Sequence, residues 1–247
     1  MPIPTTPSAT ITRRLHRDEV FDLLLEAIVG GCFGDGDRLH DTELEEWLGV
    51  SRTPIRMALA RLEDLSLIET APKRYTRVSH SRPWLVQPLL RTLCSLWALA
   101  LDDALADDEV RRAAARALGA PGDGPDLAST VAPESSAEEA RVVPSGAPAV
   151  VEALVSTARL MTRASVNHRL PELTARIGVA ISFHARSLGR DLDDERLSRA
   201  VEALRSSIGS ADVEASRHAL ADIAASPLVR AETAAAAATA TARSDGQ

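Results

Sequence analysis

The sequence predicts a mainly α fold in two parts, an N-terminal winged helix-turn-helix and a C-terminal antiparallel helical bundle. Apolar residues recur with helical spacing through most of the chain. Aromatic residues make up only 3% of the sequence, whereas Ala, Leu and Arg are abundant, and this balance favours helices over sheet. Two short segments within residues 67–79 have the pattern of strands instead.

The length and composition allow one large core or two modest ones, because 45% of the 247 residues are apolar, and two domains are the better expectation. We expect residues 1–12 to form a disordered arm, 13–82 the winged helix-turn-helix, 83–230 an all-helical domain and 231–247 a low-complexity tail. The sequence contains no run of eighteen apolar residues and no signal-peptide pattern. We therefore expect a cytoplasmic chain that does not enter a membrane.

Charge and cysteine content argue against several classes of protein. A net charge of −7 is unsuited to a chain whose whole surface binds nucleic acid. Residues 1–82 hold 11 basic and 13 acidic side chains, so nucleic-acid binding there would need a focused patch. Cys32 and Cys94 lie far apart without metal-ligand spacing, which argues against a disulfide framework or a zinc finger.

The first predicted helix begins near Arg17 and ends at Gly30 and Gly31. Apolar residues at i, i+3, i+4, i+7 and i+8 give it one buried stripe. This stripe consists of Val20, Leu23, Leu24, Ala27 and Ile28.

The following residues predict a helix-turn-helix. Thr42 is expected to cap a short helix over Glu43–Leu48, and Ser51 to cap the next one. Pro54 falls within the first turn of that second helix, where its missing N–H breaks no intrahelical bond. The expected buried stripe of the second helix is Ile55, Ala58, Leu59 and Leu62.

Two basic features are predicted in this part of the chain, one on the second helix and one on the segment after it. Arg52 lies at the exposed start of the second helix, and the periodicity places on its outward face Thr53, Arg56, Met57 and Ala60. The segments "LIETAP" and "YTRVS" predict two strands around a basic turn, the form of a wing, made cationic by Lys73, Arg74 and Arg77.

The C-terminal part reads as a helical bundle. A helix from Trp84 to Leu105 is apolar over so wide a face that it must be covered on several sides, within its own bundle or by a second subunit. Residues 119–148 predict a long loop rich in Gly, Pro and Ser. Further helices are predicted at 149–166, 171–188, 193–208 and 211–225.

The segment "GCFGDGDRLHDTELEEWLGVSRTPIRMALARLEDLSLI", above all its core "LGVSRTPIRMAL" at 48–59, resembles the DNA-binding domain of the GntR family of bacterial regulators. The helical remainder resembles the ligand-binding domain of the FadR-type (FCD) subgroup, through helix order, Arg91, Asn167 and "ADVEASRHAL" at 211–220. This resemblance implies a homodimeric transcriptional repressor that binds a palindromic operator in double-stranded DNA and is controlled by a small organic effector.

By the same resemblance, Ser51, Arg52, Thr53 and Arg56 would face the major groove and its phosphates, with Thr42 at the start of the preceding helix. Arginine can form two hydrogen bonds with guanine, and hydroxyls and helix N-terminal amides suit phosphate oxygens. The alternative is that these arginines are ordinary solvated surface charges.

The sequence departs from the family pattern at three positions. The family usually has Glu where Met57 stands, Ala where Glu45 stands and Gly where Ser66 stands. A serine in the left-handed conformation after the second helix costs about 1 kcal/mol, so we expect that helix end to be rearranged. These departures leave open a second function: a degenerate helix-turn-helix protein that acts as a structural or interaction dimer.

We expect Arg91, Asn167 and His184 to bind the effector. Arg91 is expected to anchor a carboxylate, because a buried guanidinium demands an anion; the alternative is that Arg91 forms a structural salt bridge. Many domains of this subgroup hold a divalent ion with one Asp and three His. In this chain the corresponding positions are Leu154, Ala158, Val201 and Ile223. None can ligate a metal, so we expect neither a metal site nor a cofactor.

An enzyme built on the helical domain is a third possibility. Its only obvious nucleophile or base candidates are Cys94, His168, His184 and His218. No nucleophile elbow, phosphate loop or H-E-x-x-H motif surrounds them. We therefore expect no catalytic activity.

Overall fold

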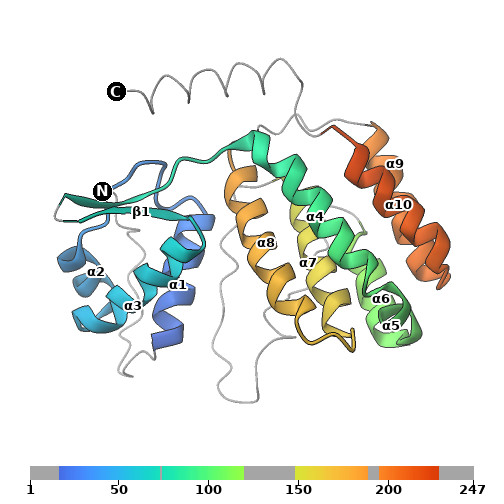
Figure 1. The fold of residues 1–247 in the computed structure, drawn as a ribbon, viewed down its shortest axis with the longest axis horizontal. Coiled ribbons are helices and arrows are strands. Elements are labelled where there is room, and N and C mark those ends of the chain that lie inside the picture. The colour runs from blue at the N-terminus through green and yellow to red at the C-terminus, as the bar shows by residue number, and fades with distance from the viewer. Residues whose placement is uncertain (1–16, 73, 120–147, 189–194, 228–247) are drawn as a thin grey trace. The chain divides into compact units, whose positions relative to one another are not determined.

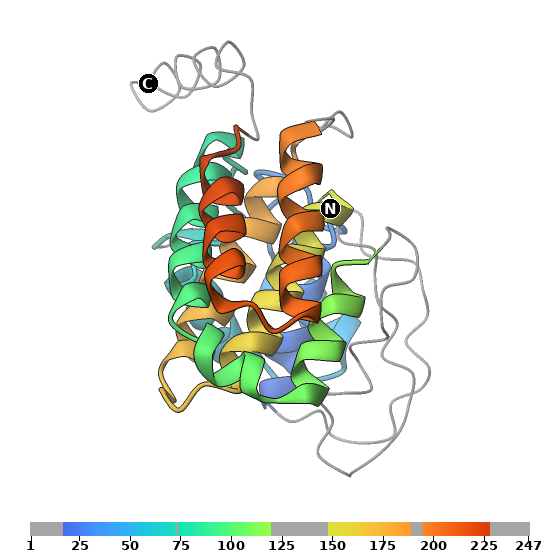
Figure 2. The same ribbon diagram turned by 90° about the vertical axis from the view of Figure 1, so that its right-hand side faces the viewer.

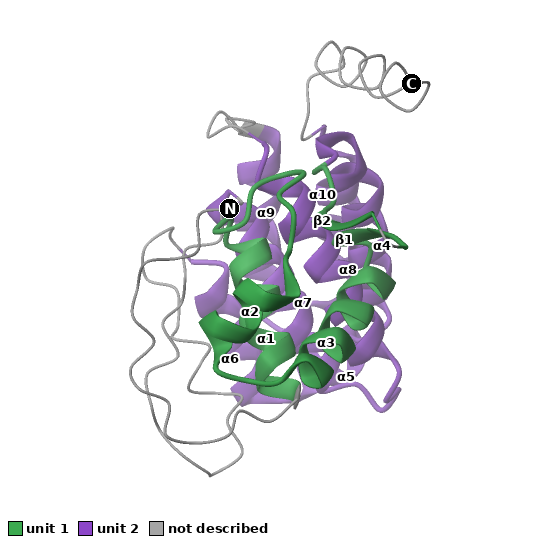
Figure 3. Cartoon of the chain, turned by 90° about the vertical axis from the view of Figure 1, so that its left-hand side faces the viewer, with its two compact units in different colours: residues 1–81, 143–146 green, residues 82–142, 147–247 purple. Residues whose placement is uncertain are grey.

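The computed structural model describes residues 17–72, 74–119, 148–188 and 195–227. The predicted arm at 1–12, the wing residue Lys73, most of the predicted loop at 119–148 and the tail at 231–247 lie outside these residues. The chain divides into two compact units, residues 1–81 with 143–146 and residues 82–142 with 147–247 (Figure 3). The predicted fold class is confirmed, since both units are helical apart from one two-stranded sheet.

The described residues of the N-terminal unit form three helices and an antiparallel hairpin (Figure 1). Its elements are α1 (Arg17–Val29), α2 (Asp41–Leu48), α3 (Arg52–Asp64), β1 (Ile68–Ala71) and β2 (Tyr75–Val78). Helix α3 packs against α1 and α2. The hairpin register pairs Ile68 with Val78 and Ala71 with Tyr75, and both Ile68 and Val78 are buried.

The core of this unit uses the apolar stripes that the periodicity predicted. Val20, Leu24 and Ile28 of α1 are fully buried, as are Ile55 and Leu62 of α3. Full burial of an aliphatic side chain is worth about 1.5–3 kcal/mol. The two stripes therefore fix the rotation of α3 about its own axis.

The predicted cap at Thr42 is wrong. Helix α2 begins at Asp41, so Thr42 lies inside its first turn and is exposed. His40 occupies the N-cap position and makes no side-chain capping bond. Asp41 and Glu43 place two carboxylates in the first turn instead, where they interact favourably with the helix dipole. Ser51 is the N-cap of α3 as predicted, again without a side-chain capping bond.

The C-terminal end of α3 is not rearranged, contrary to the expectation from Ser66. Ser66 adopts the left-handed conformation with φ of 60°. Its N–H donates to the carbonyl oxygen of Glu63 at 2.8 Å, and the N–H of Leu67 donates to that of Leu62 at 3.0 Å. These two bonds define a Schellman motif, which usually has glycine at this position. The hairpin connection is thus retained at the expense of local strain.

The C-terminal unit is a bundle of helices (Figures 1 and 2). A 3-10 turn, η1 (Pro83–Leu85), leads into the bundle. The helices are α4 (Val86–Ala98), α5 (Leu101–Ala106), α6 (Asp108–Ala117), α7 (Ala149–Arg163), α8 (Leu170–Ala185), α9 (Glu195–Gly209) and α10 (Val213–Ala225). Helix α4 packs against α7, α8 and α10, and α9 lies beside α10.

Two details of the bundle differ from the sequence prediction. The single helix predicted from Trp84 to Leu105 is wrong, because the chain turns at Leu99 and Ala100 between α4 and α5. Helix α6 has no counterpart among the predicted helices. Asp107 is its N-cap, and the Asp107 carboxylate accepts hydrogen bonds from the backbone N–H groups of Glu109 and Val110.

The apolar face of α4 is covered within its own bundle. Leu90, Leu93 and Trp97 are fully buried, together with Leu154 of α7 and Ile181 of α8. Of the two alternatives that the sequence left open, this arrangement favours burial of the face within one bundle over burial against a second subunit. Among the described residues, no helix combines the length and hydropathy needed to cross a bilayer.

We predict that Ser66→Gly stabilises the N-terminal unit by about 1 kcal/mol, because glycine adopts the left-handed conformation without a Cβ penalty. Ala60→Gly is the control. Ala60 lies in a middle turn of α3, the helix that precedes Ser66, and its side chain is exposed to solvent. This control variant should destabilise the unit by about 1 kcal/mol. Urea unfolding followed by circular dichroism measures both changes. If both variants change the free energy of unfolding in the same direction, this account of the end of α3 is wrong.

Candidate nucleic-acid interface

The N-terminal end of α3 presents a polar face to solvent. Arg52, Thr53 and Arg56 are exposed there, while Ile55 and Leu59 on the opposite side are buried. Burial of the apolar stripe thus leaves the two arginines accessible, and the predicted division of this helix into an inner and an outer face is confirmed. Ser51 is also exposed, at the N-cap of α3.

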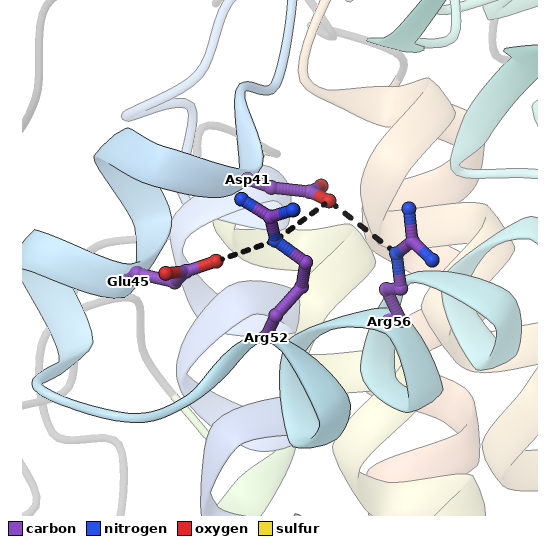
Figure 4. Close-up of polar contacts among 4 residues, drawn as sticks. All are labelled: Asp41, Glu45, Arg52 and Arg56. Atoms are coloured by element: carbon purple, nitrogen blue, oxygen red, sulfur yellow. Dashed lines mark hydrogen bonds and ion pairs between the residues drawn. The ribbon is translucent and has the colours of Figure 1, made fainter. Parts of the chain in front are cut away.

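Both arginines are held by carboxylates of α2 (Figure 4). The Nε of Arg52 donates to Oε1 of Glu45 at 2.8 Å and lies 3.7 Å from Oδ2 of Asp41. The same Asp41 oxygen accepts from the Nε of Arg56 at 3.4 Å. Among the described residues, the terminal amino groups of both arginines make no hydrogen bond. The two guanidinium groups are therefore oriented but still available to a ligand.

Solvent exposure keeps these ion pairs weak. The side chains of Arg52 and Arg56 are 54% and 70% exposed, against 27% and 31% for Asp41 and Glu45. The hydrogen bond that Arg52 donates to Glu45 raises the pKa of Arg52 above its ordinary value, so this side chain stays charged. Exposed ion pairs contribute little to folding stability. Their effect here is to position the side chains.

A groove of about 500 Å³ lies between α3 and the hairpin. It has three arginines on its walls, Arg56 from α3, Arg74 from the hairpin turn and Arg38 from the segment before α2. Arg38 is not among the DNA-binding residues predicted from the sequence. Hydrogen bonds join its segment to β2, between Leu39 and Thr76 and between Val78 and Asp37. This long-range pairing brings Arg38 to the wing, and nothing in the local sequence indicates it.

The wing carries less free positive charge than its sequence suggests. Arg74 is exposed, and its backbone N–H closes the turn on Ala71 at 2.9 Å. Arg77, in contrast, donates to Glu69 from both Nε and Nη2, at 3.0 and 2.8 Å. Its guanidinium also stacks 4.8 Å from the centre of the Tyr75 ring. The hydrogen bond to Glu69 raises the pKa of Arg77, which is thus committed to the opposite strand.

The three residues that the sequence analysis linked to an effector do not lie together. Arg91 is exposed and its Nε donates to the carbonyl oxygen of Ala224 at 3.0 Å, so the expectation of a buried guanidinium is wrong. Asn167 precedes α8, whereas His184 lies near its end and accepts from the backbone N–H of Arg82 at 3.1 Å. A 16-residue helix is about 24 Å long, which separates these two side chains.

The positions of the subgroup's metal ligands do not fit a metal ion in this chain. Leu154, Ala158 and Ile223 are fully buried in the apolar core, and Val201 packs against the same core. No cluster of three or more His, Cys, Asp or Glu residues suited to a metal ion occurs in the described part of the chain.

The candidates for catalysis are dispersed as well. Cys94 is buried on α4, and burial raises the pKa of its thiol to about 12. His168 and His218 are exposed, on the turn before α8 and on α10 respectively. A thiol with this pKa is protonated at neutral pH and is a poor nucleophile.

We predict that Cys94 resists thiol reagents in the folded protein, because its thiolate is scarce and its sulfur is buried. The Cys32→Ser variant removes the partly exposed cysteine and isolates the signal of Cys94. Absorbance measurements with a disulfide reagent at neutral pH should show slow labelling in buffer and fast labelling in denaturant. Labelling at the same rate in both conditions would contradict this prediction.

Comparisons with known proteins agree with the fold. Residues 16–78 match the family described as "Bacterial regulatory proteins, gntR family". A comparison with curated protein sequences gives no match. The chain is similar to the structure of E. coli McbR/YncC, with 20% identity over 85% of this chain and 93% of that one and a TM-score of 0.56.

A second similar structure is that of a protein from Rhodococcus sp. RHA1 assigned as a GntR transcriptional regulator. It is 18% identical over 85% of this chain and 95% of that one, with a TM-score of 0.55. At these identities the similarity concerns only the fold of the matched 85% of this chain, whereas residues 16–78 carry the match to the family.

Proposed function

We propose that this chain, whose residues 16–78 form a GntR-type winged helix-turn-helix, is a homodimeric transcriptional repressor that binds a palindromic DNA operator. The observation that carries the proposal is the exposed N-terminal face of α3. Two arginines there are held in place with their terminal amino groups available. A helix of this kind, presented by a helix-turn-helix, enters the major groove with its N-terminal residues against the base edges.

The described side chains suit distinct parts of DNA. Arg52 and Arg56 would donate to guanine O6 and N7, the commonest specific contact in the major groove. The hydroxyls of Ser51 and Thr53 and the free amides at the start of α3 suit phosphate oxygens. Arg38 and Arg74, on the groove beside α3, would contact the phosphate backbone, and their positions favour the wing as the second contact surface.

The charge of the N-terminal unit favours a dimer. Residues 1–82 hold more acidic than basic side chains, so one unit makes too few phosphate contacts for useful affinity. Two units on a two-fold axis would contact matching half-sites about one helical turn apart. The helical unit, which we assign to the FadR-type (FCD) class from its helix order, would hold the two subunits together.

We further propose that a small organic effector binds within the helical unit and controls DNA binding. Three buried polar atoms there have no hydrogen-bond partner among the described residues: Trp97 Nε1, Arg159 Nε and Thr174 Oγ1. A buried polar group without a partner destabilises the fold, and in this proposal a polar ligand supplies the missing partner. Arg159 is half-buried, and desolvation lowers the pKa of its guanidinium, so an anionic ligand would suit it.

We predict that Arg52→Ala and Arg56→Ala each weaken binding to a specific duplex by about 1–3 kcal/mol, because each removes a two-bond contact with guanine. The duplex is obtained by selection with the full-length protein from a randomised pool, alongside the DNA upstream of the chain's own gene. Fluorescence anisotropy measures the affinities.

Two variants serve as controls for this prediction. Arg116→Ala removes an exposed arginine of α6 and should leave binding unchanged. Arg74→Ala should weaken binding to all duplexes evenly and reduce the salt dependence by about one phosphate contact. If the Arg52→Ala/Arg56→Ala double variant binds the selected duplex as wild type does, α3 is not the reading helix. The degenerate helix-turn-helix would then be the better assignment.

We also predict that the full-length chain is a dimer at micromolar concentration. Light scattering should return twice the 26.3 kDa mass of the chain. The mass should stay the same in the Arg52→Ala/Arg56→Ala variant, since the dimer contact is assigned to the other unit. A monomer mass for the free protein would contradict the proposed assembly.

A further inference from the structure

Two pairs of side chains face each other across the turn of the helix-turn-helix. Asp41 and Glu45 are four residues apart on α2, and Arg52 and Arg56 are four residues apart on α3 (Figure 4). Residues with this spacing lie on one face of a helix, so the packing of α2 against α3 brings two carboxylates to two guanidinium groups. One oxygen of Asp41 lies between the two arginines.

The carboxylates occupy only one edge of each guanidinium. The carboxylates contact each arginine through its Nε, which lies 2.8 Å from Glu45 and 3.7 Å from Asp41 in Arg52 and 3.4 Å from Asp41 in Arg56. An arginine can bind guanine side-on, through Nε and one terminal amino group, or end-on, through both terminal amino groups. With Nε engaged by a carboxylate, the end-on edge remains for the base. The contact between α2 and α3 thus selects one mode of readout.

The same carboxylates change the electrostatics of the DNA-facing surface. Two negative and two positive charges give these four residues no net charge, so their attraction for any phosphate backbone is small. Binding to unrelated DNA depends mainly on such phosphate attraction. Base contacts, in contrast, depend on the orientation of the donors, which the carboxylates fix. The arrangement therefore favours sequence discrimination over general affinity.

We infer that Glu45 and Asp41 are specificity-determining positioning residues, which hold Arg52 and Arg56 end-on toward guanine and suppress binding to unrelated DNA. This inference rests on the proposed DNA-binding function. Glu45 is the more important of the two, because its hydrogen bond to Arg52 is shorter than the contact of Asp41 with Arg56.

The test compares Glu45→Ala and Glu45→Gln in the full-length protein. Anisotropy titrations use the selected duplex, the same duplex with the guanine contacted by Arg52 replaced by adenine, and an unrelated duplex. That guanine is identified as the position at which Arg52→Ala no longer discriminates. Glu45→Ala loses both the charge and the acceptor, so it should bind unrelated DNA more tightly. Its discrimination against adenine should fall by at least about fivefold, the lower limit for one two-bond contact.

Two further variants separate orientation from charge. Glu45→Gln keeps an oxygen acceptor for Nε, so it should bind unrelated DNA more tightly while retaining most of the discrimination. Glu46→Ala removes a carboxylate from an exposed neighbouring position of α2 that has no ion pair among the described residues. This variant should raise affinity for all three duplexes without changing the ratio of the affinities for the guanine and adenine duplexes. Circular dichroism confirms that each variant is folded.

The outcomes distinguish this inference from the proposed function. If wild-type protein selects no sequence, or if Arg52→Ala discriminates as wild type does, the proposed function fails and the inference fails with it. If Arg52→Ala loses discrimination but Glu45→Ala keeps it, only the positioning role is wrong. The positioning role is also wrong if Glu45→Ala gains more affinity for the selected duplex than for unrelated DNA, because the Glu45 carboxylate would then compete with the base for Arg52.

Discussion

The burial of one face of α3 is the constraint on which the candidate interface depends. Ile55 and Leu62 are two turns apart and both are fully buried, so α3 cannot rotate about its axis without exposing one of them. This rotation places Arg52 and Arg56 at the surface, on the side that faces the carboxylates of α2. The polar chemistry of the interface is thus a consequence of apolar packing, and the exposed ion pairs only refine it.

Features with a local physical cause could be predicted from the sequence. Helices α1 and α3 have clear apolar periodicity, and the hairpin has a turn between two β-rich segments. Thr42 was misassigned because several polar residues precede α2, and the choice of first residue depends on packing. The break at Leu99 and the start of α6 at Asp108 depend on how the bundle covers each segment, so local periodicity is insufficient.

The candidate site was predictable in its residues but not in its contacts. The exposed arginines follow from periodicity, whereas their pairing with Asp41 and Glu45 requires the α2–α3 packing. The ion pair of Arg77 with Glu69 follows from the strand register, since the two residues are directly opposite. No local pattern places Arg91, Asn167 and His184 together, and the expectation for Arg91 assumed a buried guanidinium. The structure separates Asn167 from His184 by the length of α8 and leaves Arg91 on the surface.

The central claim is that the N-terminal face of α3 reads bases in the major groove. A crystal structure of the full-length chain bound to its selected duplex tests this claim most directly. The account predicts an α3 helix from each of two subunits in successive major grooves, with the terminal amino groups of Arg52 on guanine O6 and N7. It also predicts that Nε of Arg52 remains on Glu45. A complex in which α3 faces away from the bases, or in which Arg52 contacts only phosphate, would contradict the account.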